Sequence, residues 1–312
     1  MCTALKFKSC IGRNFDYEQS YKEQIIKISE NQFENKYAIV GVGTGLETSY
    51  PLLYDGMNSE GLVCCGLAFE GNAEYAAPNE NMLNIPAYDF VFQILANYNS
   101  VEAVRNILLT AVITDEQFSK DFPNSDLHWF IADANEAIIV ESTTDGLDCY
   151  DAETNVLTNN PPYIKQLDVY TRAKSLIGTF DIWFGDKSEN IKNSIYNTRG
   201  LETYSLNGSY TSFGRFERAS FLIEKMENAK DVPFAYFNDI AQTFHLLGAV
   251  EQVWGVTEVA DRYEYTIYSI VYNMRTMEVE IKTYDYRNSR AVLFDGEAAR
   301  YDLFDWWFDD GL

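Results

Sequence analysis

The residues best suited to chemistry lie at the start of the chain. If Met1 is removed, Cys2 becomes the first residue and carries both a thiol and a free α-amino group. A thiolate is a strong nucleophile, and an α-amino group that titrates at roughly 7.7–8.0 can take the thiol proton without help from a histidine. The same group, once protonated, can give a proton to a departing amine. The opening of the sequence therefore predicts a nucleophile with its own base attached.

Two charged residues follow Cys2 at a spacing that a short hairpin can fold back onto it. Arg13 is expected to stabilise the thiolate, and Asp16 is expected to orient the ammonium and balance its charge. The alternative is that Cys2 is an ordinary small residue of an N-terminal strand, with both charged residues solvated in a turn. Position alone favours this alternative, so the rest of the chain must decide.

Composition limits the partners and the compartment. The 312 residues include 47 acidic and 24 basic side chains, for a net charge of −23. Nucleic acids and anionic membranes bind basic patches, so neither is expected as a partner. The sequence shows no secretory signal and no apolar run near the roughly 20 residues of a membrane span. Five cysteines without C-x-x-C spacing indicate the reduced thiols of a cytoplasmic protein.

Histidine is scarce. His128 and His245 are the only two, and neither has a partner at metal-ligand spacing. No metal or other cofactor is therefore expected, and a triad that depends on histidine would be poorly supplied.

Hydrophobic patterning divides the chain into blocks of strands and helices. Strands are expected over 2–8, 11–16, 25–28, 37–43, 62–69, 128–132, 137–141, 147–150, 156–158, 265–273 and 278–285. Turns are expected at 9–10 and over 55–61, the second joining a hairpin. Helices are expected around 88–95, after an N-cap at Ser100, over 218–226 and over 237–247. Residues 165–210 are interpreted as loop and short helix.

This order segregates strands from helices, which favours an α+β fold in which helices cover two packed antiparallel sheets. One domain is expected to span residues 2–312. The acidic, aromatic end of the chain, 302–312, is expected to cover a sheet edge or to lie at a subunit contact.

Several segments, taken together, resemble the choloylglycine hydrolase family of conjugated bile salt hydrolases and penicillin V acylases. They are MCT (1–3), GRNFD (12–16), KYAIVGVGT (36–44), DGMNSEGL (55–62), GLAF (66–69), NIPAYDF (84–90), SVEAVRNIL (100–108), LHWFIAD (127–133), VLTNNP (156–161), GRFERASFL (214–222) and KTYD (282–285). The resemblance runs from residue 2 to about 285, and the combination is far more specific than one motif.

The resemblance implies an N-terminal nucleophile (Ntn) hydrolase fold, a four-layer αββα sandwich. It also implies roles for single residues. Cys2 resembles the nucleophile, and Arg13 and Asp16 match the family's GRN-x-D pattern. Asn159 matches the asparagine that donates to the oxyanion, the Ala68 backbone N–H matches a second donor, and Arg215 matches a second active-site arginine.

The sequence departs from the family pattern in three places. Ala68 stands where bile salt hydrolases commonly carry Asn and penicillin V acylases often carry Tyr. A backbone N–H survives this change, so the departure affects substrate choice more than catalysis. The segment between Asn159 and Arg215 has little sequence that resembles the family. The segment from Cys2 to Arg13 is shorter than the family leads us to expect.

The resemblance implies an amide hydrolase, with a glycine- or taurine-conjugated bile salt preferred as substrate. Penicillin V or another N-acyl amine is the alternative, and a catalytically silent ligand-binding member or scaffold is a more remote one. The acyl group is expected to contact Tyr17, Tyr21, Leu46 and Phe122, in the loops around 17–21, 45–53 and 118–122. The family also implies a homo-oligomer, commonly a tetramer.

Overall fold

Two antiparallel sheets form the centre of the fold. The computed structural model describes residues 1–44, 50–120, 122–177, 200, 203–229 and 238–305. The first sheet has the order β12 (Val156–Leu157), β1 (Cys2–Phe7), β2 (Cys10–Tyr17), β14 (Arg262–Asn273), β15 (Val279–Thr283) and β16 (Arg290–Val292), with β13 (Thr257–Val259) paired to β14.

The second sheet has eight strands. Its order is β11 (Gly146–Asp151), β10 (Ala137–Thr143), β9 (Leu127–Ala132), β6 (Val63–Ala68), β5 (Leu53–Asn58), β4 (Ile39–Gly43), β3 (Gln24–Ile28) and β17 (Ala299–Asp302). Beside it, β7 (Leu83–Pro86) and β8 (Ala111–Thr114) form a short parallel pair, which the sequence analysis missed.

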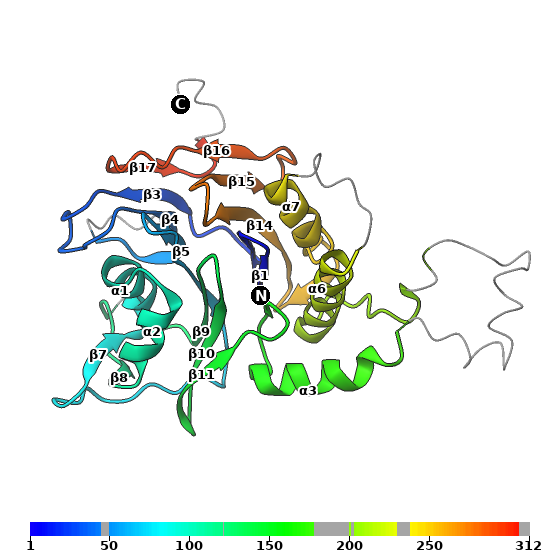
Figure 1. Ribbon diagram of the computed structural model, residues 1–312, viewed down its shortest axis with the longest axis horizontal. Helices are drawn as coiled ribbons and strands as arrows, with labels where there is room; N and C mark the ends of the chain where they lie inside the picture. Colours follow the sequence, from blue (N-terminus) through cyan, green and yellow to red (C-terminus); the bar gives the residue numbers. More distant parts are fainter. Residues whose placement is uncertain (45–49, 121, 178–199, 201–202, 230–237, 306–312) are drawn as a thin grey trace, which may run out of the picture.

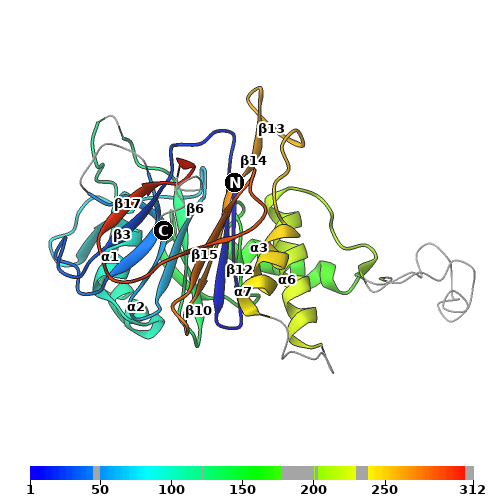
Figure 2. The same cartoon turned by 90° about the horizontal axis from the view of Figure 1, so that it is seen from above.

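Helices cover the outer face of each sheet, as Figures 1 and 2 show. A 3₁₀ turn, η1 (Ala87–Asp89), leads into α1 (Phe90–Asn97) and α2 (Val101–Leu108), which lie on the eight-stranded sheet. On the other side, α6 (Ser212–Glu227) and α7 (Asp239–Gly248) pack on the seven-stranded sheet, and α3 (Tyr163–Lys174) packs on α6. The α+β class and the four-layer αββα sandwich are therefore confirmed.

Two apolar cores lie on the two faces of the eight-stranded sheet. One fills the space between the sheets and extends to the helices behind β1 and β2, with Phe130 and Tyr268 among its fully buried members. The other joins the outer face to α1 and α2, where Phe90 stacks on Trp129 at 4.2 Å between ring centroids. The strands of the central layers are buried on both faces, which explains their continuous apolar runs.

Two turn predictions were wrong in their boundaries. The turn expected at 55–61 is confined to its second half, because β5 continues to Asn58 and the Asn58 side chain accepts from the N–H groups of Glu60 and Leu62. Gly61 closes this turn at φ +80°, where a Cβ would lie 2.5 Å from the Met274 carbonyl oxygen. The first hairpin likewise turns at Lys8 and Ser9, so Cys10 already belongs to β2.

The interpretation of residues 165–210 as loop and short helix agrees with the described part of this segment. Its first part belongs to α3, a twelve-residue helix that buries Tyr163, Gln166 and Tyr170 on one face. Residues 178–199 of this segment lie outside the described residues.

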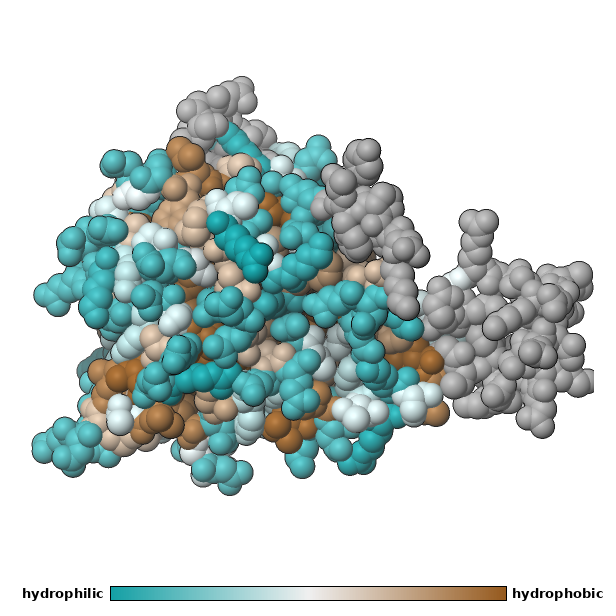
Figure 3. Space-filling model, in the orientation of Figure 1, coloured by the Kyte–Doolittle hydropathy of each residue, from teal (hydrophilic) through white to brown (hydrophobic). Residues whose placement is uncertain are grey.

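Only the first residue of the acidic segment 302–312 belongs to a described strand. Strand β17 pairs with β3 and closes the eight-stranded sheet, and this pairing includes Asp302. Residues 306–312 lie outside the described residues. None of the described helices combines the length and apolar character needed to cross a membrane. The face shown in Figure 3 is mostly hydrophilic, in keeping with the acidic composition.

Candidate active site

Strand pairing places Arg13 beside Cys2. In the β1–β2 pair, Cys2 lies opposite Phe15 and Ala4 lies opposite Arg13. Alternate residues of a strand share a face, so Cys2, Arg13 and Phe15 all point into the space between the two sheets. The Nη2 atom of Arg13 lies 3.7 Å from the Cys2 sulfur and donates to the Gly66 carbonyl at 2.6 Å. The predicted proximity of Arg13 to the thiol is therefore present in the structure.

Asp16 belongs to the opposite face of β2, which meets the helices. Its Oδ1 accepts from Thr266 Oγ1 at 2.6 Å, and its Oδ2 lies 3.7 Å from Arg215 Nη1. Burial raises the pKa of the Asp16 carboxyl, and the Arg215 charge opposes that shift. The terminal amine of Met1 donates to the backbone carbonyl of Asp16 at 2.6 Å. In this form of the chain the carbonyl, rather than the carboxylate, bonds the chain terminus.

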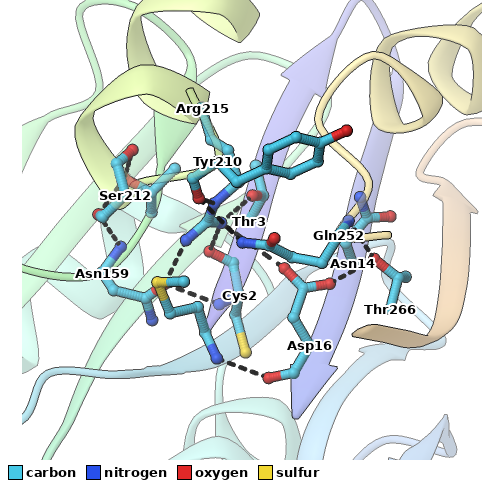
Figure 4. A network of polar contacts seen from close by, with 12 residues as sticks. Cys2, Thr3, Asn14, Asp16, Asn159, Tyr210, Ser212, Arg215, Gln252 and Thr266 are labelled. Carbon is cyan, nitrogen blue, oxygen red and sulfur yellow. Dashed lines mark hydrogen bonds and ion pairs between the residues drawn. The ribbon is translucent and has the colours of Figure 1, made fainter. Parts of the chain in front are cut away.

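Arg215 connects the parts of the site, as Figure 4 shows. It reaches inward from α6 and is fully buried. Its Nη1 donates to the Cys2 carbonyl at 2.6 Å and to Thr3 Oγ1 at 2.5 Å, and its Nη2 donates to Asn159 Oδ1 at 2.9 Å. Burial lowers the pKa of its guanidinium, and the nearby Asp16 opposes that shift. Arg215 therefore fixes the backbone of the nucleophile in relation to Asn159.

Asn159 follows β12 and lies against Cys2. Its Oδ1 accepts from the Cys2 backbone nitrogen at 2.7 Å, and its Nδ2 donates to the Ala68 carbonyl at 2.8 Å. Its own backbone is held by two buried side chains, since Ser212 Oγ accepts from its N–H and Gln166 Nε2 donates to its carbonyl. Asn159 thus joins β1 of one sheet to β6 of the other.

The strand geometry also orients Ala68. The Phe69 N–H donates to the Asp126 carbonyl, which makes the neighbouring pair, Ala68 and Leu127, a non-hydrogen-bonded one. The N–H and C=O of Ala68 therefore face away from β9, toward the side from which Asn159 approaches. The Asn159 Nδ2 and the Ala68 backbone N–H, the two donors of the predicted oxyanion site, thus come from neighbouring segments.

The chain terminus lies in a buried, acidic environment. The Met1 ammonium forms an ion pair with Glu264 of β14, which is only 2% exposed. Burial lowers the pKa of this amine, and the Cys2 and Asp16 charges oppose that shift. The Cys2 nitrogen, one residue further along, already faces Asn159. Removal of Met1 would make this nitrogen the free α-amine.

A cavity of about 640 Å³ opens on the Cys2 thiol. Its wall is mainly apolar and aromatic, and it includes three of the four predicted substrate-contact residues, Tyr17, Tyr21 and Phe122. Leu46, the fourth, lies outside the described residues. The aromatic rings that line the cavity are Phe15, Tyr17, Tyr21, Tyr54, Tyr88 and Phe122. Glu70 and Asp126 are its two acidic lining residues.

Sequence reasoning missed the side chains that support the site. Asp55 lies in the segment interpreted as a turn, yet it is buried and bonds Arg13. Gln166 lies in the segment that had no clear pattern. Thr266 and Glu264 alternate along β14 with apolar positions, but nothing in that alternation reveals which distant residue each one contacts. Among the described residues, no group of three or more His, Cys, Asp or Glu side chains could hold a metal ion.

Comparison with known proteins identifies the family. The model of the linear amide C–N hydrolases, choloylglycine hydrolase family, matches residues 2–302. The chain belongs to the choloylglycine hydrolase family. A bile salt hydrolase/transferase of Lactiplantibacillus plantarum is 35% identical over 311 residues, covering 95% of this chain and 93% of that protein. The enzyme is therefore a hydrolase of linear amide C–N bonds, as the resemblance implied.

Solved structures agree with this assignment. The C2A mutant of a conjugated bile acid hydrolase from Clostridium perfringens superposes with a TM-score of 0.84 at 30% identity, covering 96% of each chain. A penicillin V acylase from Agrobacterium tumefaciens gives a TM-score of 0.69 at 18% identity, over 96% of this chain and 90% of that one. The second likeness concerns the fold alone.

Proposed function

We propose that this choloylglycine hydrolase cleaves the amide bond of glycine- or taurine-conjugated bile salts, with Cys2 as its N-terminal nucleophile. The observation that carries the proposal is the aromatic cavity of about 640 Å³ that opens on the Cys2 thiol. Its volume falls within the range of roughly 300–1,000 Å³ typical of small-molecule sites. A large apolar acyl group suits such a lining, and the relatives named above act on bile salts.

Removal of Met1 is the first step of the proposed mechanism. The freed α-amine of Cys2 takes the thiol proton, and the sulfur attacks the amide carbon. The negative charge on the carbonyl oxygen is stabilised by the Ala68 N–H and by the Asn159 amide, whose Nδ2 carries one N–H beyond the one that donates to Ala68. Arg13 supports the sulfur as its charge develops.

The tetrahedral intermediate then collapses. The C–N bond breaks, the α-ammonium gives its proton to the departing amine, and a thioester remains on Cys2. Water, deprotonated by the same amine, attacks the thioester and releases the acid. Asp16 Oδ2, which accepts no hydrogen bond from the described residues, is suited to hold the ammonium form.

The test compares amine release from glycocholate, taurocholate and penicillin V, with intact-mass analysis of the same sample. We expect Met1 to be absent, both bile salts to be cleaved faster than penicillin V, and Cys2→Ser to lose nearly all turnover while keeping the fold. Cleavage of penicillin V alone would refute the substrate. Full activity with Met1 retained would refute the mechanism.

The proposal includes the organisation of the protein in the cell. A single domain over residues 2–312 is proposed from the order of the strands and helices, a cytoplasmic location from the reduced cysteines, and a homotetramer from the family. Light scattering on the purified enzyme tests the tetramer, and a monomer at micromolar concentration would contradict it.

A further inference from the structure

Asp55 forms the centre of a buried polar cluster behind the nucleophile. It is fully buried on β5, in the sheet that faces Cys2. Its Oδ2 accepts from Tyr268 Oη at 2.6 Å and forms an ion pair with Arg13 Nη1, while its Oδ1 accepts from Tyr272 Oη. Three donors from two strands of the opposite sheet thus converge on one carboxylate.

The same arginine contacts the nucleophile. Arg13 is 1% exposed, and its Nη2 faces the Cys2 sulfur at 3.7 Å while its Nη1 faces Asp55. Its guanidinium also lies over the Phe15 ring, 4.9 Å from the centroid. The guanidinium is therefore confined between a thiol on one edge and a carboxylate on the other, in surroundings that screen charge poorly.

We propose that Asp55 sets the electrostatic field that Arg13 exerts on the Cys2 thiol, by balancing most of the guanidinium charge. Asp55 acts on the sulfur only through Arg13. The inference rests on the proposed role of Cys2 as nucleophile.

Two tyrosines donate hydrogen bonds to the buried Asp55 side chain. Burial, reinforced by the Asp55 charge, raises the pKa of Tyr268 and of Tyr272 well above its usual value. Both phenols therefore stay protonated and remain donors to the carboxylate. A buried carboxylate with two phenolic donors and an arginine has the partners that a buried charge requires.

Charge balance and simple positioning predict opposite results for one substitution. If Asp55 balances charge, Asp55→Asn leaves the Arg13 cation uncompensated and favours the thiolate. If Asp55 only holds Arg13 in place, the same change displaces the guanidinium and disfavours the thiolate, as removal of the arginine would. The pH profile of Cys2 alkylation distinguishes the two.

Other charged and titratable groups face Cys2 or Arg13, and they are unchanged in the comparison. They are Asp16 and Tyr17 of β2, Tyr54 of β5, Cys64 and Cys65 of β6, Tyr268 of β14 and Arg215 of α6, together with the chain terminus and its ion-pair partner Glu264. Any difference between the parent enzyme and a variant at residue 55 is therefore assigned to Asp55.

The experiment measures the rate of Cys2 alkylation by iodoacetamide from roughly pH 5 to pH 10, by mass spectrometry of the N-terminal peptide. We expect Asp55→Asn to move the midpoint to lower pH by about one unit, and Arg13→Met to move it to higher pH. Asp133→Asn is the matched control. It removes another buried carboxylate, which accepts from the Val101 N–H at the start of α2, and it should leave the midpoint unchanged.

An unchanged or raised midpoint in Asp55→Asn would overturn the inference. If that variant fails to fold, Tyr272→Phe replaces it, because this tyrosine contacts Asp55 and the change leaves the Arg13 contacts with Asp55 and Cys2 in place. Loss of one donor leaves more negative charge facing Arg13, so the midpoint should rise by a few tenths of a unit. A fall, or no change, would equally overturn the inference. If Cys2 in the parent enzyme reacts no faster than a buried thiol, the proposed nucleophile itself is wrong.

Discussion

Replacement of Asn159 tests the contribution of the oxyanion site separately from that of the nucleophile. Its side chain has an acceptor function, from Cys2 N and Arg215 Nη2, and a donor function, to the Ala68 carbonyl. Asn159→Asp keeps the acceptor and removes the donor, at almost the same volume. The variant therefore removes the donor and adds one negative charge, whereas Asn159→Ala would leave the buried Cys2 and Arg215 donors without a partner.

The expected loss follows from one missing oxyanion donor. Such deletions reduce kcat by about 10²–10³, which corresponds to about 3–4 kcal/mol of transition-state stabilisation. KM should change by no more than about threefold, because the donor acts on charge that develops only in the transition state. Alkylation of Cys2 by iodoacetamide forms no oxyanion, so its plateau rate should stay within a few-fold of the parent enzyme.

The assay pairs glycocholate hydrolysis with iodoacetamide alkylation of the same sample. Asn160→Asp is the matched control, since it adds the same charge at the neighbouring asparagine, whose side chain donates to the Glu70 carbonyl. A loss of kcat below about tenfold in Asn159→Asp would refute the oxyanion role. An equal loss of alkylation and hydrolysis would show that Asn159 serves only to place Cys2.

Two further predictions concern stability. Burial raises the pKa of Asp89 to about 6 from 3.8, despite hydrogen bonds from Tyr50 and Gln93, so stability falls as pH rises through that interval. Asp89→Asn should therefore stabilise the enzyme by about 1–3 kcal/mol at pH 7 and by much less below roughly pH 4. Urea titrations at the two pH values measure this difference. An equal gain in stability at both pH values would contradict the raised pKa of Asp89. Gly12→Ala should destabilise by about 1–3 kcal/mol in the same assay, because its Cβ would lie 2.6 Å from Thr243 Cγ2 on α7. Gly208→Ala, with no atom within 4 Å of the added Cβ, is its control, and equal stabilities would refute the packing argument.

The sequence predicts the elements of this fold better than it predicts their contacts. Helical periodicity locates α1 and α2, because each buries a regular face, and an apolar run locates β9, which is buried on both faces. The parallel pair β7–β8 and the closing strand β17 are short and partly exposed, so they carry little periodic signal.

The residues of the site also differ in how far the sequence predicts their positions. Local spacing in the first hairpin is enough to place Arg13 near Cys2, since a single register relates them. Asn159 and Arg215 come from positions more than 150 residues away, and only the family resemblance predicts them. Neither local spacing nor the family resemblance predicts the roles of Asp55 and Gln166. A polar residue in a turn-rich or irregular segment gives no indication that it will be buried against a distant group.

The two halves of the site come from different layers of the sandwich. The proposed nucleophile, Arg13 and Asp16 belong to the seven-stranded sheet, and Arg215 belongs to the helix behind it. Most of the cavity wall, including Leu52, Tyr88 and Phe122, comes from the eight-stranded sheet and its connecting loops. Substitutions in the eight-stranded layer can therefore change the selectivity for the acyl group while the nucleophile and its neighbours in the seven-stranded layer keep their positions. Grafting of cavity loops from a relative onto this chain can use the same separation.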